Sequence, residues 1–142
     1  KDLIITAGGK NVSPGQLETT VMTSPVVAQC LVIGDRKPFI AALITLDLDD
    51  ANAWLASQGA ATADSLEELS KNPIVHAEVE RIVNKANEGV SRAESIRKFE
   101  ILPDEFTQVN GMLTASLKSR RAQIVDHYRK LIDTVIYVPR KK

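Results

Sequence analysis

The stretch VVAQCLVIGDRKPFIAALITL, residues 26–46, decides the fold. Its two halves are rich in β-branched and other apolar residues, and a polar turn at residues 35–38 separates them. Two such runs joined by a short turn predict an antiparallel β-hairpin. Because both runs are almost continuously apolar, at least one face of this hairpin must be covered by helices.

The segments around the hairpin supply those helices. Ser13, Pro14 and Gln16 have the spacing of a capping box, which predicts a helix that stops near residues 23–25. Three further helices are predicted. The first spans residues 47–58, the second is capped by Asp64 or Ser65 and ends at Leu69, and the third begins at Asn72-Pro73.

Short strands are predicted at residues 1–6 and 98–102, with a glycine turn at residues 8–11. A long amphipathic helix is predicted from about Ser119, and its apolar stripe would comprise Ile124, Val125, Tyr128, Leu131, Ile132 and Val135. A small sheet with helices packed on it gives the fold class α+β.

The composition limits the classes of function. The chain has 142 residues, 44% hydrophobic and 25% charged, as expected of one folded domain. Eighteen basic and eighteen acidic residues give a formal charge of zero, which argues against a nucleic-acid or anionic-lipid binder. No apolar run reaches the length of a membrane span. The single cysteine suits a reducing cytoplasm, so we expect a cytoplasmic protein.

Most catalytic patterns are missing from the sequence. His76 and His127 are far apart and have no partner at ligand spacing, so no metal site is expected. Cys30 lies in an apolar strand, which favours a core position over a nucleophile. The turn Gly8-Gly9-Lys10 could bring backbone N–H groups close to a ligand, but it lacks the spacing of a phosphate loop. Its spacing alone favours a simple tight turn.

Lys118 stands between a loop of small and polar residues and a predicted helix start. A cation there does not complement the helix dipole, which favours anions at that end. A bound phosphate or carboxylate would explain it, and an exposed lysine in a basic cluster is the alternative.

Two segments together resemble a known family. KDLIITAGGKNVSP at residues 1–14 and NGMLTASLKSRR at residues 110–121 resemble the hinge-loop and catalytic-lysine motifs of adenylate-forming enzymes. The whole chain resembles the C-terminal subdomain of bacterial long-chain fatty acyl-CoA synthetases. The resemblance implies that residues 1–142 form a mobile lid domain and that a large N-terminal domain, its partner, holds most of the ATP and acyl surface.

The resemblance also implies a reaction. The parent would join a fatty acid to ATP as an acyl-adenylate, release pyrophosphate, and then transfer the acyl group to coenzyme A. ATP and Mg²⁺ would be bound mainly by the N-terminal domain. Implied roles are the adenylation lysine for Lys118, the hinge for Lys1 and Asp2, the pantetheine tunnel for Thr6, Ala7, Gly8 and Gly9, and a phosphate contact for Lys10.

The chain departs from the family pattern in places, and alternatives stay open. The lysine motif commonly reads LTPT, whereas residues 113–116 read LTAS. A helical insert at residues 47–97 favours the long-chain group. We expect the chain alone to have no ligase activity. An acyl-AMP ligase domain, or a non-catalytic scaffold of the same fold, is an alternative function, and peripheral association of the parent with a membrane is not decided by these residues. A basic-tail module that binds nucleic acid is disfavoured by the net charge.

Overall fold

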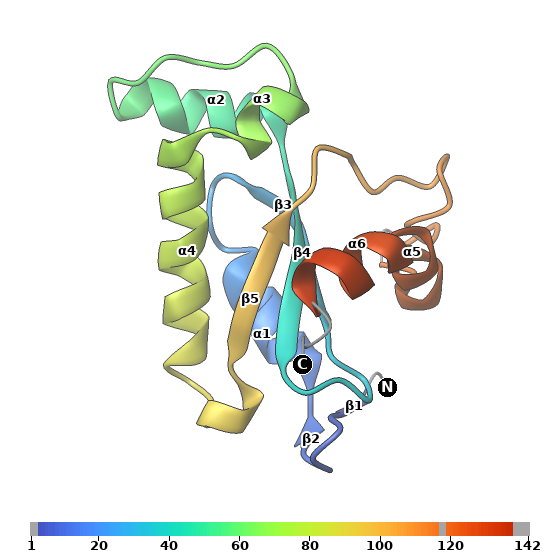
Figure 1. Ribbon diagram of the computed structural model, residues 1–142. Helices are drawn as coiled ribbons and strands as arrows, with labels where there is room; N and C mark the ends of the chain where they lie inside the picture. The colour runs from blue at the N-terminus through green and yellow to red at the C-terminus, as the bar shows by residue number, and fades with distance from the viewer. Residues whose placement is uncertain (1–2, 117–118, 138–142) are drawn as a thin grey trace. The chain divides into compact units, whose positions relative to one another are not determined.

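The computed structural model describes residues 3–116 and 119–137 and divides the chain into two compact units, residues 1–105 and 106–142. The first unit contains a three-stranded sheet in the order β3-β4-β5 (Figure 1). Strand β3 (Val27–Ile33) pairs antiparallel with β4 (Ile40–Leu46), so the predicted hairpin is confirmed. Strand β5 (Ile96–Ile101) pairs parallel with β4. The predicted α+β class is therefore confirmed.

Two helices of the first unit cover one face of this sheet (Figure 1). They are α1 (Pro14–Val21) and α4 (Pro73–Asn87), and α2 (Leu48–Ser57) and α3 (Leu66–Ser70) follow the end of β4. The core combines the apolar stripes of the helices with alternate strand residues, among them Leu17, Val79, Val32 and Ile44. Asp47, Ser65 and Asn72 each accept a hydrogen bond from a first-turn N–H, which fixes where α2, α3 and α4 begin.

The N-terminal segment differs from the sequence prediction in two respects. Within the described part of residues 1–6, the predicted strand is confined to β1 (Ile4–Ile5). It pairs with a second short strand, β2 (Asn11–Val12), that the sequence did not indicate. The prediction of a capping box at the start of α1 was wrong, because the Ser13 side chain accepts no capping hydrogen bond. Pro14 at the first helical position starts the helix instead, since its fixed φ suits that position and it has no N–H to satisfy.

A side chain forms hydrogen bonds with one residue at each edge of the sheet. At the β3 edge, the Glu18 carboxylate accepts a hydrogen bond from the Val32 N–H at 2.8 Å. At the β5 edge, the Asn87 amide accepts from the Ile96 N–H at 2.8 Å and donates to the Ile96 carbonyl at 3.0 Å. These contacts occupy backbone groups that an exposed edge would offer to another strand.

The predicted long C-terminal helix is broken. It comprises α5 (Arg121–His127), α6 (Arg129–Leu131) and a π-helical turn at Ile132–Ile136, with Tyr128 in a non-helical conformation between α5 and α6. The wider π turn shifts the buried face by one residue, so Ile136 is 2% exposed whereas Val135 is 45% exposed. The predicted stripe is therefore correct at Ile124 and Ile132 and wrong at Val135. None of the helices in the described ranges combines the length and the apolar character needed to cross a bilayer.

A buried carboxylate links α4 to the loop that precedes β3. Glu78 on α4 is 7% exposed and accepts a hydrogen bond from the Ser24 hydroxyl at 2.8 Å. Arg81, one turn later, donates to both carboxylate oxygens at 2.8 Å. The Arg81 hydrogen bonds, the Ser24 hydrogen bond and the charge of Arg81 lower the pKa of Glu78, although burial opposes them.

This pKa shift predicts acid sensitivity. Because the folded chain holds Glu78 at a lower pKa than the unfolded chain does, the unfolded chain binds more protons below about pH 5, and the free energy of unfolding falls there as the pH drops. We expect Glu78→Gln to lower the free energy of unfolding at pH 7 by about 1–3 kcal/mol and to flatten its decline at acid pH. Urea denaturation from pH 7 to pH 3 measures both effects.

Glu80→Gln is the matched control, because it removes an equal charge from an exposed position on the same helix. Equal stability profiles for the two variants would contradict a structural role for the buried carboxylate.

Candidate functional site

The predicted glycine turn connects β1 to β2 as a closed loop. The Gly9 N–H donates to the Thr6 carbonyl at 2.9 Å, and the Thr6 N–H donates to the Lys10 carbonyl at 3.0 Å. Thr6 is 8% exposed, and its hydroxyl accepts from the Lys10 N–H at 3.1 Å. Thr6 therefore holds the loop from inside, while Ala7, Gly8 and Gly9 are exposed at its tip.

Hydrogen bonds fasten this loop to the turn between β3 and β4. The Ala7 N–H donates to the Lys37 carbonyl at 2.9 Å, and the Arg36 N–H donates to the Ile5 carbonyl at 2.7 Å. The Ile5 N–H donates to the Asp35 carboxylate at 3.2 Å. The glycine loop thus has a fixed position relative to the three-stranded sheet.

The two loop glycines serve different needs. Gly9 has φ +86°, a left-handed conformation that residues with a side chain rarely adopt. Gly8 has no such requirement, and a Cβ built on it would meet no heavy atom within 4 Å in the described residues. The fold of the described residues therefore explains Gly9 but not Gly8, where they leave room for a side chain.

Lys10 lies within electrostatic reach of Glu94, which belongs to the 3-10 turn Arg92–Glu94. Hydrogen bonds from the Ser91 side chain and backbone are the main cause that lowers the pKa of Glu94, and the charge of Lys10 makes a smaller contribution in the same direction. Lys10 is exposed and close to the glycine tip, so its ammonium can approach an anion there.

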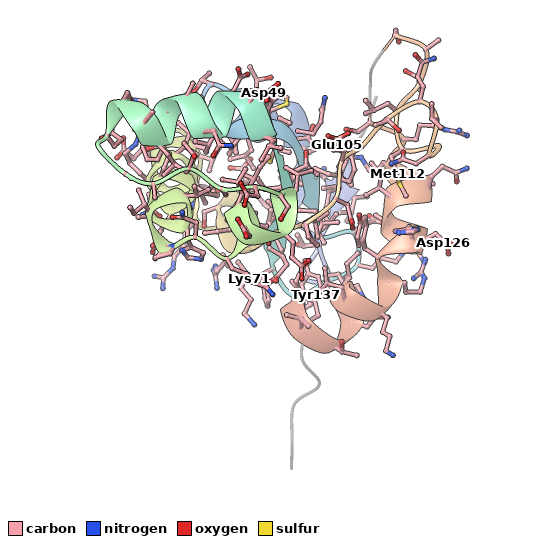
Figure 2. The ribbon with its side chains drawn as sticks, turned by 90° about the horizontal axis from the view of Figure 1, so that it is seen from above. Asp49, Lys71, Glu105, Met112, Asp126 and Tyr137 are labelled. Atoms are coloured by element: carbon pink, nitrogen blue, oxygen red, sulfur yellow. The ribbon has the colours of Figure 1, made fainter. Side chains whose placement is uncertain are left out.

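The lysine motif lies in the second unit, and its two ends are tied together. The Arg120 N–H donates to the Met112 carbonyl at 2.8 Å, and Leu113 and Ser119 form an isolated antiparallel bridge. Figure 2 shows Met112 beside the start of α5, which this loop precedes. Lys118 itself lies outside the described residues, as do the predicted hinge residues Lys1 and Asp2.

Cys30 and His127, which the sequence analysis also considered, lie away from the glycine loop in sequence and have ordinary structural surroundings. Cys30 is 2% exposed in β3, as predicted for a core residue. His127 is exposed and makes an edge contact with the Tyr128 ring. The sequence did not indicate that Asp35 and Arg36 would hold the glycine loop, although an Asp at the start of a turn is a known signal for side-chain bonding to nearby backbone.

Comparison with known proteins gives these features a context. Residues 1–138 match the family model described as the AMP-binding enzyme C-terminal domain. The chain belongs to this family. It is 41% identical over 135 residues to the long-chain-fatty-acid–CoA ligase FadD15 of Mycobacterium tuberculosis, and 29% identical over 152 residues to the human long-chain-fatty-acid–CoA ligase ACSBG2.

The matches cover nearly all of this chain but little of the relatives. They span 95% of the chain and 22% of FadD15, and 94% of the chain and 22% of human ACSBG2. Among solved structures, the AMP-bound A-PCP didomain of the carboxylic acid reductase from Segniliparus rugosus matches 96% of the chain and 17% of its own length, with a TM-score of 0.71. That structure is 24% identical, so it supports the fold alone.

The different roles of the two glycines can be tested by stability. We expect Gly9→Ala to lower the free energy of unfolding by about 1–2 kcal/mol, because alanine is strained at positive φ. Gly8→Ala should change it by less than about 0.5 kcal/mol, because the added methyl meets no described atom. Chemical denaturation of both variants measures the difference. Equal losses of unfolding free energy in the two variants would contradict the different roles assigned to Gly8 and Gly9.

Proposed function

We propose that this chain is the C-terminal domain of a long-chain fatty acid–CoA ligase. The parent joins a fatty acid to ATP as an acyl-adenylate with release of pyrophosphate, and then transfers the acyl group to coenzyme A. The observation that carries the proposal is the 41% identity to FadD15 over 95% of the chain. The open glycine loop supports it, since the fold itself does not require Gly8.

In the thioester-forming step, the glycine loop lines the passage for the pantetheine arm of coenzyme A. Gly8 has no side chain, so the arm can pass close to the backbone there. The buried Thr6 holds the loop conformation through its hydroxyl, and Ala7 fixes the loop to the hairpin turn. Lys10 contacts phosphate from the exposed side of the loop.

In the adenylation step, Lys118 acts between the fatty acid carboxylate and the nucleotide. A lysine ammonium is a compact cation that stabilises the negative charge on the transferring group when the site is closed to water. The bonds between Met112 and Arg120 and between Leu113 and Ser119 support this role, because they hold the two ends of the loop that carries the lysine.

The other parts of the reaction belong to the parent. A large N-terminal domain binds ATP with Mg²⁺ and the fatty acid, and the backbone at Lys1 and Asp2 changes between the two half-reactions. The described residues form no group of three or more metal-ligating side chains. We place the parent in the cytoplasm, for which the buried free thiol of Cys30 is suited.

The lysine role is tested in the full-length parent with palmitate, ATP and coenzyme A, scoring pyrophosphate and thioester separately. Lys118→Ala should reduce pyrophosphate release on the order of 100-fold, because the developing charge loses its cation. Lys130→Ala, an exposed position on α6, is the matched control.

The products of the wild-type parent in that assay distinguish a CoA ligase from the alternatives. Pyrophosphate without thioester in the wild type would make the parent an acyl-AMP ligase. Neither product with several fatty acids would leave only a shared fold. The 142-residue chain alone should form neither product.

The tunnel role is tested by Gly8→Leu in the parent. A leucine side chain should obstruct the pantetheine arm, so thioester formation should fall at least about tenfold further than pyrophosphate release does. Ala61→Leu adds a similar side chain on an exposed linker and serves as the control. An equal effect of Gly8→Leu on both half-reactions would argue against the tunnel.

A further inference from the structure

The side chain of Asn110 organises a tight turn in the second unit, at residues 107–112, which we call the Asn110 turn. The Oδ1 atom of Asn110 accepts hydrogen bonds from the Thr107 N–H at 3.0 Å and from the Met112 N–H at 3.1 Å. In return, the Thr107 hydroxyl accepts from the Asn110 N–H at 3.1 Å. One amide oxygen therefore connects the first residue of the turn to the last.

Burial does not explain the residue type at position 110. Asn110 is exposed, and the neighbouring Val109 is 99% exposed. A side chain that met only solvent could be any polar residue, whereas two backbone N–H groups on either side of a turn need a short side chain that ends in an acceptor. The hydrogen bonds to residues 107 and 112 therefore account for an asparagine here.

Met112 connects this turn to the lysine motif. Its N–H is shared between the Asn110 side chain and the Thr107 carbonyl, with a distance of 3.1 Å to each. Its carbonyl accepts the N–H of Arg120, which follows the lysine in sequence, at 2.8 Å. Met112 therefore has one polar backbone group bonded within the turn and the other bonded across the lysine loop.

Leu113 forms a second connection between the same two segments. Its N–H donates to the Thr107 carbonyl at 3.0 Å, and it forms the isolated bridge with Ser119. Residues 112 and 113 are thus held on one side by the Asn110 turn and on the other by residues 119 and 120. A displacement of the turn would displace both ends of the segment that carries Lys118.

We propose that Asn110 is a positioning residue for Lys118 in the adenylation step. This inference rests on the proposed ligase function, in which Lys118 stabilises charge while a carboxylate oxygen of the fatty acid attacks the α-phosphorus of ATP and pyrophosphate leaves. The Asn110 amide takes no part in that chemistry. It acts through Met112, because a reacting group displaced by about 1 Å loses much of its effect on the rate.

The test measures the two half-reactions separately in the full-length parent. Pyrophosphate release from palmitate and ATP reports adenylation, and thioester formation from supplied palmitoyl-adenylate and coenzyme A reports the second step alone. Asn110→Ala removes the acceptor and should lower kcat for pyrophosphate release about tenfold. KM for ATP and the rate of thioester formation should each change less than about twofold, because the lost interaction serves the adenylation transition state only.

Two further variants separate positioning from a general loss of structure. Asn110→Asp keeps an acceptor oxygen at the same distance from the backbone and should hold pyrophosphate release within about threefold of the wild type. Asn52→Ala is the matched control, because the Asn52 amide makes the same kind of contact elsewhere: it accepts the Ala63 N–H and donates to the Ala63 carbonyl, both at 2.8 Å. Asn52→Ala should leave the ratio of the two half-reactions unchanged.

Three results would overturn the inference. Equal losses in both half-reactions for Asn110→Ala would show that the turn supports the domain as a whole. Wild-type pyrophosphate release in Asn110→Ala would show that the turn does not position the lysine. Equally low rates in Asn110→Asp and Asn110→Ala would exclude the acceptor oxygen as the cause. A wild-type parent that releases no pyrophosphate is a different failure, because it refutes the proposed function and this inference with it.

Discussion

The central strand β4 imposes the main constraint on this structure. All seven of its residues are buried, and it has a hydrogen-bonded strand on each side, β3 antiparallel and β5 parallel. Such a strand has no polar side to place in water, so its position is stable only when both faces are covered. In the first unit, α1 and α4 cover one face, which accounts for the apolar stripes on these helices.

The candidate site is tied to that constraint through the hairpin turn. The turn at one end of β4 accepts the Ala7 N–H and donates to the Ile5 carbonyl, so the glycine loop is an extension of the sheet. Hydrogen bonds at Ile5 and Ala7 hold the loop against the turn. The glycine loop and the β3–β4 turn therefore keep the same spacing within the first unit.

The sequence predicted those features that depend on neighbouring residues. The hairpin followed from two apolar runs, and Ser65, one of the two caps predicted for α3, is the observed one. Such signals act within a few residues. The parallel pairing of β4 with β5 was not predicted, since no local pattern encodes a partner as distant in sequence as Ile96 is from Ile40. The resemblance selected the residues from Thr6 to Lys10, and the structure brings them into one turn. Arg36 adopts a left-handed backbone conformation with a φ of +63°. The sequence did not indicate it, because arginine as a residue type does not favour that conformation.

The parallel pair has a consequence for how the chain folds. The two strands of the hairpin are neighbours in sequence, so they can pair early at a small entropic cost. Strand β5 can join β4 only after the segment that contains α2, α3 and α4 has closed a long loop. The Asn87 side chain, which binds the first residue of β5, comes at the end of that segment. The helical segment therefore separates two paired strands widely in sequence and raises the contact order of the domain, which predicts slower folding than the local hairpin alone would give.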